Sequence, residues 1–434
     1  MRRCTIAVLM LSMIVTPLLV GATSGGKSLL SVGVTGNVQS EGKGNPTFLM
    51  HPLEVQKLLL AIAEEPRDLA YASRTLEGSD ITVDDLLALK LLRQDDDRLV
   101  INFNFLTQQD QAEIVRVATP HAAALANGYL QHREQIETIL ATRGLPDVPA
   151  TYYAYILIGC FSLDWDGLLF TDDPRFRAAA THRSGDDLYT PWAKERGEEV
   201  SLKGLYWGSH NAYRKNANLT TFGDHHSLPR AGFPDLGWSL RVDTDRLPGD
   251  GETRETIARA ARRFLRDLAG AVGEVMLALG NGPKSVDELT VTTSLPAETL
   301  IDLLALLEEI EYVAVVGSRY RATVPVLTDT DTPMVRKLLS LGRQVIRQWH
   351  EEHYDALASE LSHITPLKHG VPYGVVYTEV WHFVFALANR ELVEAGFLAD
   401  PYAGNRRYKG FIPTVWRPGQ ERLEDGDGPT VAPH

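Results

Sequence analysis

The sequence predicts a mainly α-helical protein with small β-hairpins, built from two copies of one unit. Three observations predict this class. Apolar residues recur at the spacing of amphipathic helices over much of the chain. Short stretches with the alternation and turn residues of β-strands and hairpins interrupt these helices. The same order of patterns appears between residues 52 and 174 and again between residues 266 and 401, which indicates an internal duplication.

The composition limits the classes of partner. The chain has 434 residues, which is enough for two domains with hydrophobic cores. It carries 56 acidic and 43 basic residues, a formal net charge of -13 at pH 7. This charge repels phosphate backbones unless basic residues gather locally, so nucleic acid is not an expected partner. The two cysteines, Cys4 and Cys160, provide no disulfide framework.

Residues 1–22 have the pattern of an export signal. Two arginines precede an apolar run up to Val20, and small residues ending at Ala22 follow. We expect a signal peptide, an exported periplasmic or extracellular protein, and no stable membrane span after its removal. Residues 23–49 are predicted to be a low-complexity leader. The alternative is a cytoplasmic protein whose true start lies near Met50.

The first copy is assigned to residues 50–180. A helix is expected from Pro52 to Glu65, then a short helix, then a third helix that Thr82 caps together with Asp85. Strict alternation of apolar and polar residues from Leu99 to Phe105 indicates a half-buried strand, the one clear strand of this copy.

The second copy is assigned to residues 258–415, and residues 416–434 are a polar tail. Its pattern predicts three helices followed by two β-like runs around a turn. These lie at Leu268–Leu279, at Ser285–Leu289, from Pro296 onward, at Tyr312–Val316 and at Tyr320–Val326, with the turn at Gly317-Ser318-Arg319.

In each copy a long helix and then a second apolar helix follow. The first copy has them at Gln109–Ala141, with a bend expected at Pro120, and at Tyr152–Asp166. The second copy has them at Thr332–Ser362 and Val375–Ala395. Each copy is therefore predicted to combine a small three-helix unit with long helices.

Three helices followed by a β-hairpin is the order of a winged helix. The motifs are Ser285-Val286-Asp287-Glu288-Leu289, Leu295-Pro296-Ala297-Glu298-Thr299-Leu300 and Tyr320-Arg321-Ala322-Thr323-Val324-Pro325. The stretch from Glu274 to Thr328 thereby resembles the ArsR and MarR-like winged-helix regulators. The resemblance implies dimers whose long helices pack together around a ligand cavity. Two copies in one chain would form an internal pseudo-dimer with a pocket between its repeats.

The resemblance also implies a third helix that enters the DNA major groove, but the charges of this sequence oppose it. No Lys or Arg occurs between Leu295 and Val316, while Glu298 and Asp302 lie on the predicted third helix. An acidic helix is repelled by every phosphate that it approaches. We therefore expect a protein that does not bind DNA.

Residues 181–257 are predicted to be a polar, aromatic-rich insertion and linker of loops or short strands. His210 or His226 is a candidate general acid or base that Asp224 would orient. His210, Asp224 and His225 are also ligand types for zinc or iron, so a divalent metal is one candidate cofactor. The alternative is that these histidines cap turns or form hydrogen bonds within the loop.

Two further groups of residues are candidates for the site. Asp164 and Asp166 are paired carboxylates at an apolar helix end, where one raised pKa would make a proton donor; two solvated acids are the alternative. The candidate ligand-binding residues are aromatic or polar side chains of the insertion and of the last long apolar helix. They are Tyr206, Trp207, Tyr377, Glu379, Trp381 and His382.

The chain contains no nucleophile elbow, phosphate loop, dinucleotide fingerprint or His-Glu-x-x-His helix, so whether it is an enzyme stays open. The sequence predicts an exported protein that binds, and in one version also processes, a small molecule or peptide between its repeats. The alternatives are a cytoplasmic ArsR/MarR-like regulator and a scaffold that docks a protein partner.

Overall fold

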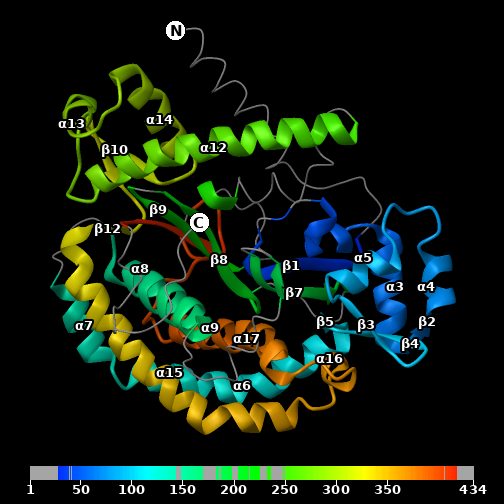
Figure 1. Ribbon diagram of the computed structural model, residues 1–434. Helices are drawn as coiled ribbons and strands as arrows, with labels where there is room; N and C mark the ends of the chain where they lie inside the picture. Colours follow the sequence, from blue (N-terminus) through cyan, green and yellow to red (C-terminus); the bar gives the residue numbers. More distant parts are fainter. Residues whose placement is uncertain are drawn as a thin grey trace.

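The computed structural model describes residues 28–142 without 39 and 41, 148–169, 182–184, 187–197, 204–224 without 215, 232–235, 247, and 250–417 without 405. Over these residues the protein is mainly helical with small β-sheets, as predicted. Figure 1 shows two small units, one around α3 to α5 and one around α12 to α14, on different sides of a body of long helices. The predicted signal peptide, His225 and His226 lie outside the described residues.

The first small unit has the predicted helices and two strands more than predicted. Its elements are α3 (Leu53–Glu64), β2 (Arg67–Asp68), α4 (Leu69–Thr75), α5 (Val83–Ala88), β3 (Leu92–Asp95) and β4 (Arg98–Ile101). Thr82 and Asp85 form the predicted capping box of α5. Strand β3 was not predicted because it is a mostly exposed edge strand, and its polar residues show no apolar alternation.

The predicted strand from Leu99 to Phe105 is two strands in two different sheets. It divides into β4 and β5 (Asn104–Leu106), and the chain leaves the hairpin between them. Asn104 was expected on the solvent face but is fully buried, because its amide donates hydrogen bonds to Val375 O and Thr378 Oγ1. A buried amide with partners cannot be told from an exposed one by alternation alone.

The second small unit follows the predicted order. Its elements are α12 (Gly251–Leu279), α13 (Val286–Thr292), α14 (Ala297–Glu309), β10 (Val313–Val316) and β11 (Arg319–Ala322). Asp250 caps α12, which therefore begins earlier than the predicted Leu268. Pro296 is the N-cap of α14 and not its first helical residue. A bridge between Lys284 and Tyr320 adds a third extended segment to the hairpin.

Long helices and the short helices that connect them form the body between the two units. They are α6 (Gln108–Leu130), α7 (Arg133–Ala141), α8 (Ala150–Ala154), the π-helix η2 (Tyr155–Asp166), α9 (Gly167–Leu169), η4 (Asp329–Asp331), α15 (Thr332–Glu360), α16 (Thr365–Lys368) and α17 (Tyr373–Glu394). The α6 helix continues through Pro120, which stands on its exposed face, and is interrupted instead at Gln131 and His132. The predicted helices Thr332–Ser362 and Val375–Ala395 match α15 and α17 closely.

The insertion supplies strands to both of the larger sheets. In one sheet β7 (Asp187–Glu195) lies between β1 (Leu30–Asn37) and β5, and β6 (His182–Ser184) also pairs with it. In the other, the order is β12 (Val326–Leu327), β13 (Phe411–Trp416), β9 (Asn218–Asp224) and β8 (Trp207–Tyr213). The strand after each hairpin, β5 or β12, thus pairs in parallel with its neighbour.

Part of the predicted low-complexity leader is folded. Strand β1 pairs with β7 along its whole length, and η1 (Gly42–Gly44) and α2 (Pro46–Met50) follow. Leu30, Leu49 and Met50 are buried in the core of the first unit. The strand was not predicted because the segment is rich in small residues, which are typical of loops. One of them, Gly33, is needed in β1 because a Cβ atom there would clash with the Trp192 ring.

Buried apolar side chains form three cores, one in each small unit and one among the long helices. Within the part of the chain that the structure describes, no single helix is both long and apolar enough to cross a membrane. The helices α13 and α14 reach that length and composition only together, across a bend of 112°.

Candidate functional site

A group of polar side chains lies inside the protein where β1, β7, the start of β8 and α17 meet. We call Thr35, Lys194, Tyr206, Glu379 and His382 the central cluster. The Lys194 Nζ atom lies 2.5 Å from Glu379 Oε2, and the Tyr206 hydroxyl donates a 2.6 Å hydrogen bond to the same oxygen. The Thr35 hydroxyl donates to Glu379 Oε1 at 3.1 Å. One carboxylate therefore joins four segments that are far apart in the sequence.

Local structure explains how these side chains converge. Alternation along β7 places Trp192 and Lys194 on one face of the strand. The Lys194 ammonium lies 3.6 Å from the Trp192 ring centre and 3.7 Å from that of Tyr206, an arrangement of cation–π contacts. On α17, Glu379 and His382 are three residues apart, and the His382 ring stacks on Tyr206 at 4.9 Å.

Burial sets the charge states of the cluster. The Lys194 side chain is 1% exposed, and burial lowers its pKa to about 8 although Glu379 opposes this. Burial alone would raise the pKa of Glu379, but Lys194, His382 and hydrogen bonds outweigh it and lower that pKa. Burial lowers the pKa of His382 and raises that of Tyr206. The ion pair thus keeps Glu379 ionised without fully offsetting the burial of Lys194.

Asp164 lies near the central cluster, because its two chain neighbours contact the same elements: Leu163 O accepts a hydrogen bond from Trp381 of α17, and Trp165 donates one to Ser209 of β8. Asp164 stands on η2 and is 3% exposed. Burial raises the pKa of Asp164 to about 7, while hydrogen bonds with Ser209 lower it by less. The pKa of both acids is raised, and the large shift is that of Asp164. A carboxyl group with this pKa exchanges its proton near neutral pH.

Asp166 has a different environment. Its carboxylate makes two hydrogen bonds to Arg343 of α15, of 3.0 and 3.3 Å. Burial raises the pKa of Asp166, and the neighbouring guanidinium opposes that shift. Asp164 and Asp166, although adjacent in the predicted pattern, thus have separate partners.

Several buried polar atoms have no hydrogen-bond partner among the residues that the structure describes, including Asn104 Oδ1, Gln111 Oε1 and Tyr373 Oη. Three such groups stand on η2, β8 and α17, which contact one another: Asp164 Oδ2, Trp207 Nε1 and the side-chain amide of Asn389. A methyl group placed on Gly159 would approach both Asn389 Oδ1 and the Phe222 ring, and the Trp207 ring packs on Phe222. We call Asp164, Trp207 and Asn389 the unpaired set; its members come from η2, β8 and α17.

The remaining candidate ligand residues lie in an aromatic group next to the cluster. The Tyr377 hydroxyl is 2.9 Å from His350 Nε2, and Trp381 Nε1 donates to Leu163 O at 2.7 Å. The six predicted ligand-binding residues are all buried, and they divide between the central cluster, the unpaired set and this aromatic group.

His210 is paired with a different acid from the one predicted. Its Nδ1 lies 2.6 Å from Asp235 Oδ1, and Asp235 is 3% exposed. In the pairing of β8 with β9, His210 faces Thr221 and Trp207 faces Asp224, so His210 and Asp224 lie three positions apart and on opposite faces of the sheet. Asp224 therefore cannot orient His210 or share a metal ion with it.

Asp224 forms its hydrogen bonds on the other side of the sheet. Its Oδ2 accepts a 2.8 Å hydrogen bond from Gly204 N and one from the Tyr402 hydroxyl. Among the residues described, no group of three His, Cys, Asp or Glu side chains is arranged to hold a metal ion. The proposed contributions of His225 and His226 fall outside those residues.

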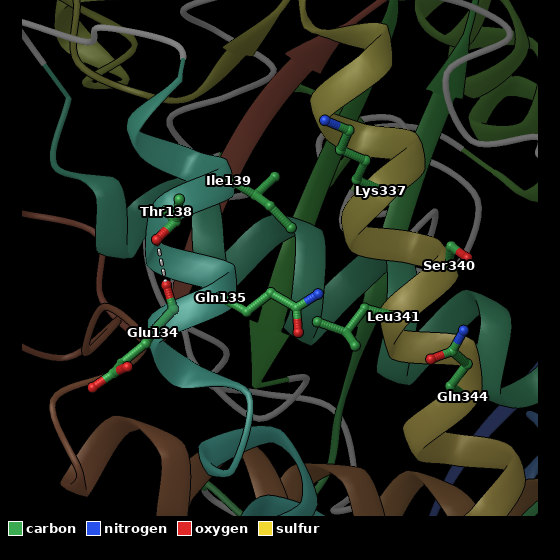
Figure 2. Close-up of a pocket in the computed structure, with 8 residues that line it drawn as sticks. All are labelled: Glu134, Gln135, Thr138, Ile139, Lys337, Ser340, Leu341 and Gln344. Atoms are coloured by element: carbon green, nitrogen blue, oxygen red, sulfur yellow. Dashed lines mark hydrogen bonds between the residues drawn. The ribbon is translucent and has the colours of Figure 1, made fainter.

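Two surface hollows lie away from these side chains. One, of about 620 Å³, runs between α7 and α15 and is shown in Figure 2. It is lined by Glu134, Gln135, Thr138, Ile139, Lys337, Ser340, Leu341 and Gln344. The other, of about 290 Å³, lies beside the C-terminal half of α12. Neither is lined by a candidate residue from the sequence.

The sequence contained some signal for the residues that were missed. Lys194 follows Trp192 by two positions in a run with strand propensity, which places a charge in phase with an aromatic side chain. Asp235 and Asn389 carry no comparable pattern, because their neighbours in the fold come from distant segments.

Comparison with protein-family models, with characterised proteins and with solved structures finds no match to this chain.

Proposed function

We propose that the protein binds a small polar molecule at the junction where η2, β8 and α17 meet, next to the central cluster. The observation that carries this proposal is the unpaired set. A buried polar group without a partner costs about 1–3 kcal/mol, so three of them in one region are expected to have a use. Asp164 and Asn389 offer acceptors, and Trp207 and Asn389 offer donors.

The enclosure of the site favours a small molecule over a peptide. All three members of the unpaired set are buried, and they are surrounded by aromatic side chains such as Phe222 and Phe385. A peptide would need an open groove for its flanking residues. Binding in this interior requires the insertion to separate transiently from α17, so we expect slow association and slow release.

The same groups support acid–base chemistry on a bound molecule. The pKa of Asp164 is raised to about 7 and that of Lys194 is lowered to about 8, so both exchange protons near neutral pH. His210, held by Asp235, is a second candidate base on the neighbouring face of the β8–β9 sheet. We propose that the function is binding of the small molecule. Acid–base catalysis on that molecule would be an additional activity of the same site.

We further propose that the two small units are winged helices related by duplication, and that the chain is an internal pseudo-dimer. Each unit has three helices and a hairpin, and in each a capping box, Thr107 with Asp110 or Thr328 with Asp331, precedes a long helix. A DNA-binding role is disfavoured because α14 is acidic on its exposed face and Arg319 of the hairpin is paired with Glu288.

Export remains our proposal for the location of the protein. A chain that began near Met50 would lack β1, which covers β7 and supplies Thr35 to the central cluster. N-terminal sequencing of the protein from its native host, in each cell fraction, tests this. A cytoplasmic protein beginning near Met50 would contradict it and favour the regulator.

Ligand binding is tested by thermal unfolding with a set of amino acids, hydroxy acids, sugars and nucleosides as probes. A binder should raise the melting temperature of the wild type but not that of Asn389→Leu or Trp207→Phe. Without a probe, Asn389→Leu should be more stable than the wild type, because an unpaired amide is replaced by an apolar group of similar size.

Asn281→Leu is the matched control, because Asn281 is exposed in the turn after α12. It should keep the response to the probe. The proposal is wrong if a probe that stabilises the wild type stabilises Asn389→Leu and Trp207→Phe equally. It is also wrong if Asn389→Leu is destabilised as much as a core deletion, since the amide would then have a structural partner.

A further inference from the structure

Helix α12 carries a row of three exposed arginines along one face, followed at i+4 from the second of them by the exposed Asp267. Arg259, Arg263 and Arg266 follow one another at i, i+4 and i+7 and are all exposed. The opposite face of the helix, which includes Ala261 and Leu265, is buried in the core of the second unit. Within the described part of the chain, none of the three guanidinium groups has an ion-pair partner.

This row is unusual in a chain with a net charge of -13. Several arginines elsewhere are paired, as Arg116 is with Glu113 and Arg133 is with Glu137, while Arg74, Arg336 and Arg390 have no ion pair among the described residues. Near the row, Arg214 donates a hydrogen bond to Arg266 O, and burial and the charge of Arg266 lower the pKa of Arg214 although Asp267 raises it. Three exposed arginines against Asp267 leave this face of the helix with net positive charge among the described residues, which favours an anionic partner.

Helix α14 of the same unit carries an acidic row with the same spacing. Glu298 and Asp302 stand at i and i+4 on its exposed face, and neither has an ion-pair partner among the described residues. Glu309 continues the row and pairs with Arg407. Between these charges the Ile301 side chain is 53% exposed.

The two rows have the same spacing and opposite charges. Four residues of helix correspond to about 6 Å, so the Arg259–Arg263 and Glu298–Asp302 pairs present charges at the same interval. Phe264, which is 39% exposed, lies next to Arg263 as Ile301 lies next to Asp302. A partner that places an acidic row like that of α14 against α12 would neutralise the charges of both rows. It would also cover Phe264 and Ile301.

We propose that this partner is a second copy of the chain, with α12 of each copy docked against α14 of the other. Because both rows belong to one unit, a twofold arrangement forms the contact twice and is closed. An anionic lipid surface or a nucleic acid would suit the arginines, but it would repel the neighbouring acidic row. Charge complementarity therefore favours the second copy.

The test is the mass of the full chain in solution, measured by light scattering after size exclusion. We expect a dimer at low salt that dissociates at about 0.5 M NaCl, where the Debye length is only about 4 Å. The variants Arg259→Glu/Arg263→Glu and Glu298→Lys/Asp302→Lys should each be monomeric. Their equal mixture should dimerise again, because each then offers the charges that the other lacks.

Arg336→Glu, an exposed change on α15, is the control and should keep the dimer. A wild type that stays monomeric at low salt overturns the proposal. So does a dimer that both charge-reversed variants retain. Binding of the wild type to anionic vesicles or DNA, lost in the arginine variant while the protein stays monomeric, would assign the row to that partner instead.

Discussion

The ion pair between Lys194 and Glu379 gives the sharpest quantitative prediction. Their side chains are 1% and 0% exposed, so the variant Glu379→Gln leaves an ammonium group inside the protein without a counter-ion. Removing one partner of a buried pair costs about 3–5 kcal/mol. Lys194→Met is expected to cost a similar amount, because it leaves the buried carboxylate without a counter-ion.

The double variant Lys194→Met/Glu379→Gln should lose no more stability than either single variant, since it leaves no unpaired charge. For a cooperative chain of 434 residues, an unfolding entropy of about 2.1 cal/mol/K per residue amounts to about 0.9 kcal/mol/K. A loss of 3–5 kcal/mol then lowers the melting temperature by about 3–5 °C.

Urea and thermal unfolding, followed by tryptophan fluorescence, measure these effects. Lys337→Met is the matched control, because Lys337 is exposed at the edge of the hollow between α7 and α15 (Figure 2) and should change stability by less than about 0.5 kcal/mol. Additive losses in the double variant, or single variants as stable as the control, would refute the reasoning.

The pH dependence of the same variants checks the charge of Lys194. Its pKa falls from 10.5 to about 8 on folding, so between these values the unfolded chain binds more protons. Stability should therefore rise with pH over that window, by up to about 3 kcal/mol, and Lys194→Met should lack this rise.

The other predictions concern Asp164, a histidine pair and the N-terminal strand. Burial raises the pKa of Asp164 from 3.8 to about 7, so the contribution of Asp164 to stability falls as the pH rises through that window. Asp164→Asn should therefore stabilise the protein by up to about 4 kcal/mol at pH 8 but not at pH 4, as measured by urea unfolding. His121 Nδ1 lies 2.9 Å from His353 Nδ1, and burial and His121 lower the pKa of His353. The free energy of unfolding should therefore fall below about pH 6.5, where the unfolded chain takes up protons more readily than the folded one. The variant His353→Gln should reduce this fall. Deletion of residues 1–49 should give an insoluble or unfolded protein in expression trials, because β7 loses its partner β1; a soluble, cooperatively folding product would show that β1 is dispensable.

Features that depend on neighbouring residues were predictable. Thr82 and Asp85 are three residues apart, and their capping box starts α5 as expected. The periodicity of α15 and α17 gave both helices to within a few residues. Glu379 and His382 interrupt an apolar helix, and they do lie together in a buried polar cluster. In each case the information lies within one or two helical turns.

Features that depend on pairing between distant segments were not predictable. His210 and Asp224 are close in the sequence and chemically suited, yet strand register puts them on opposite faces of one sheet. The partner of His210 is Asp235, which reaches it from a short helical turn beyond β9. The π-helical winding of η2, which carries Asp164, has no signature that separates it from an α-helix in the sequence.

If the protein binds the proposed ligand, the arrangement of the central cluster would link that binding to assembly of the whole chain. Glu379 lies on the last long helix, Thr35 on the first strand, and Lys194 and Tyr206 on the insertion between the two units. None of these segments forms the cluster alone, because each supplies only one or two of its side chains. A ligand that contacts Asp164, Trp207 and Asn389 would join η2, β8 and α17 in the same way and would stabilise only the assembled state. The unpaired atoms then weaken the junction in the absence of ligand and strengthen it in its presence, which is the behaviour expected of a binding site and not of a core that has only to be stable.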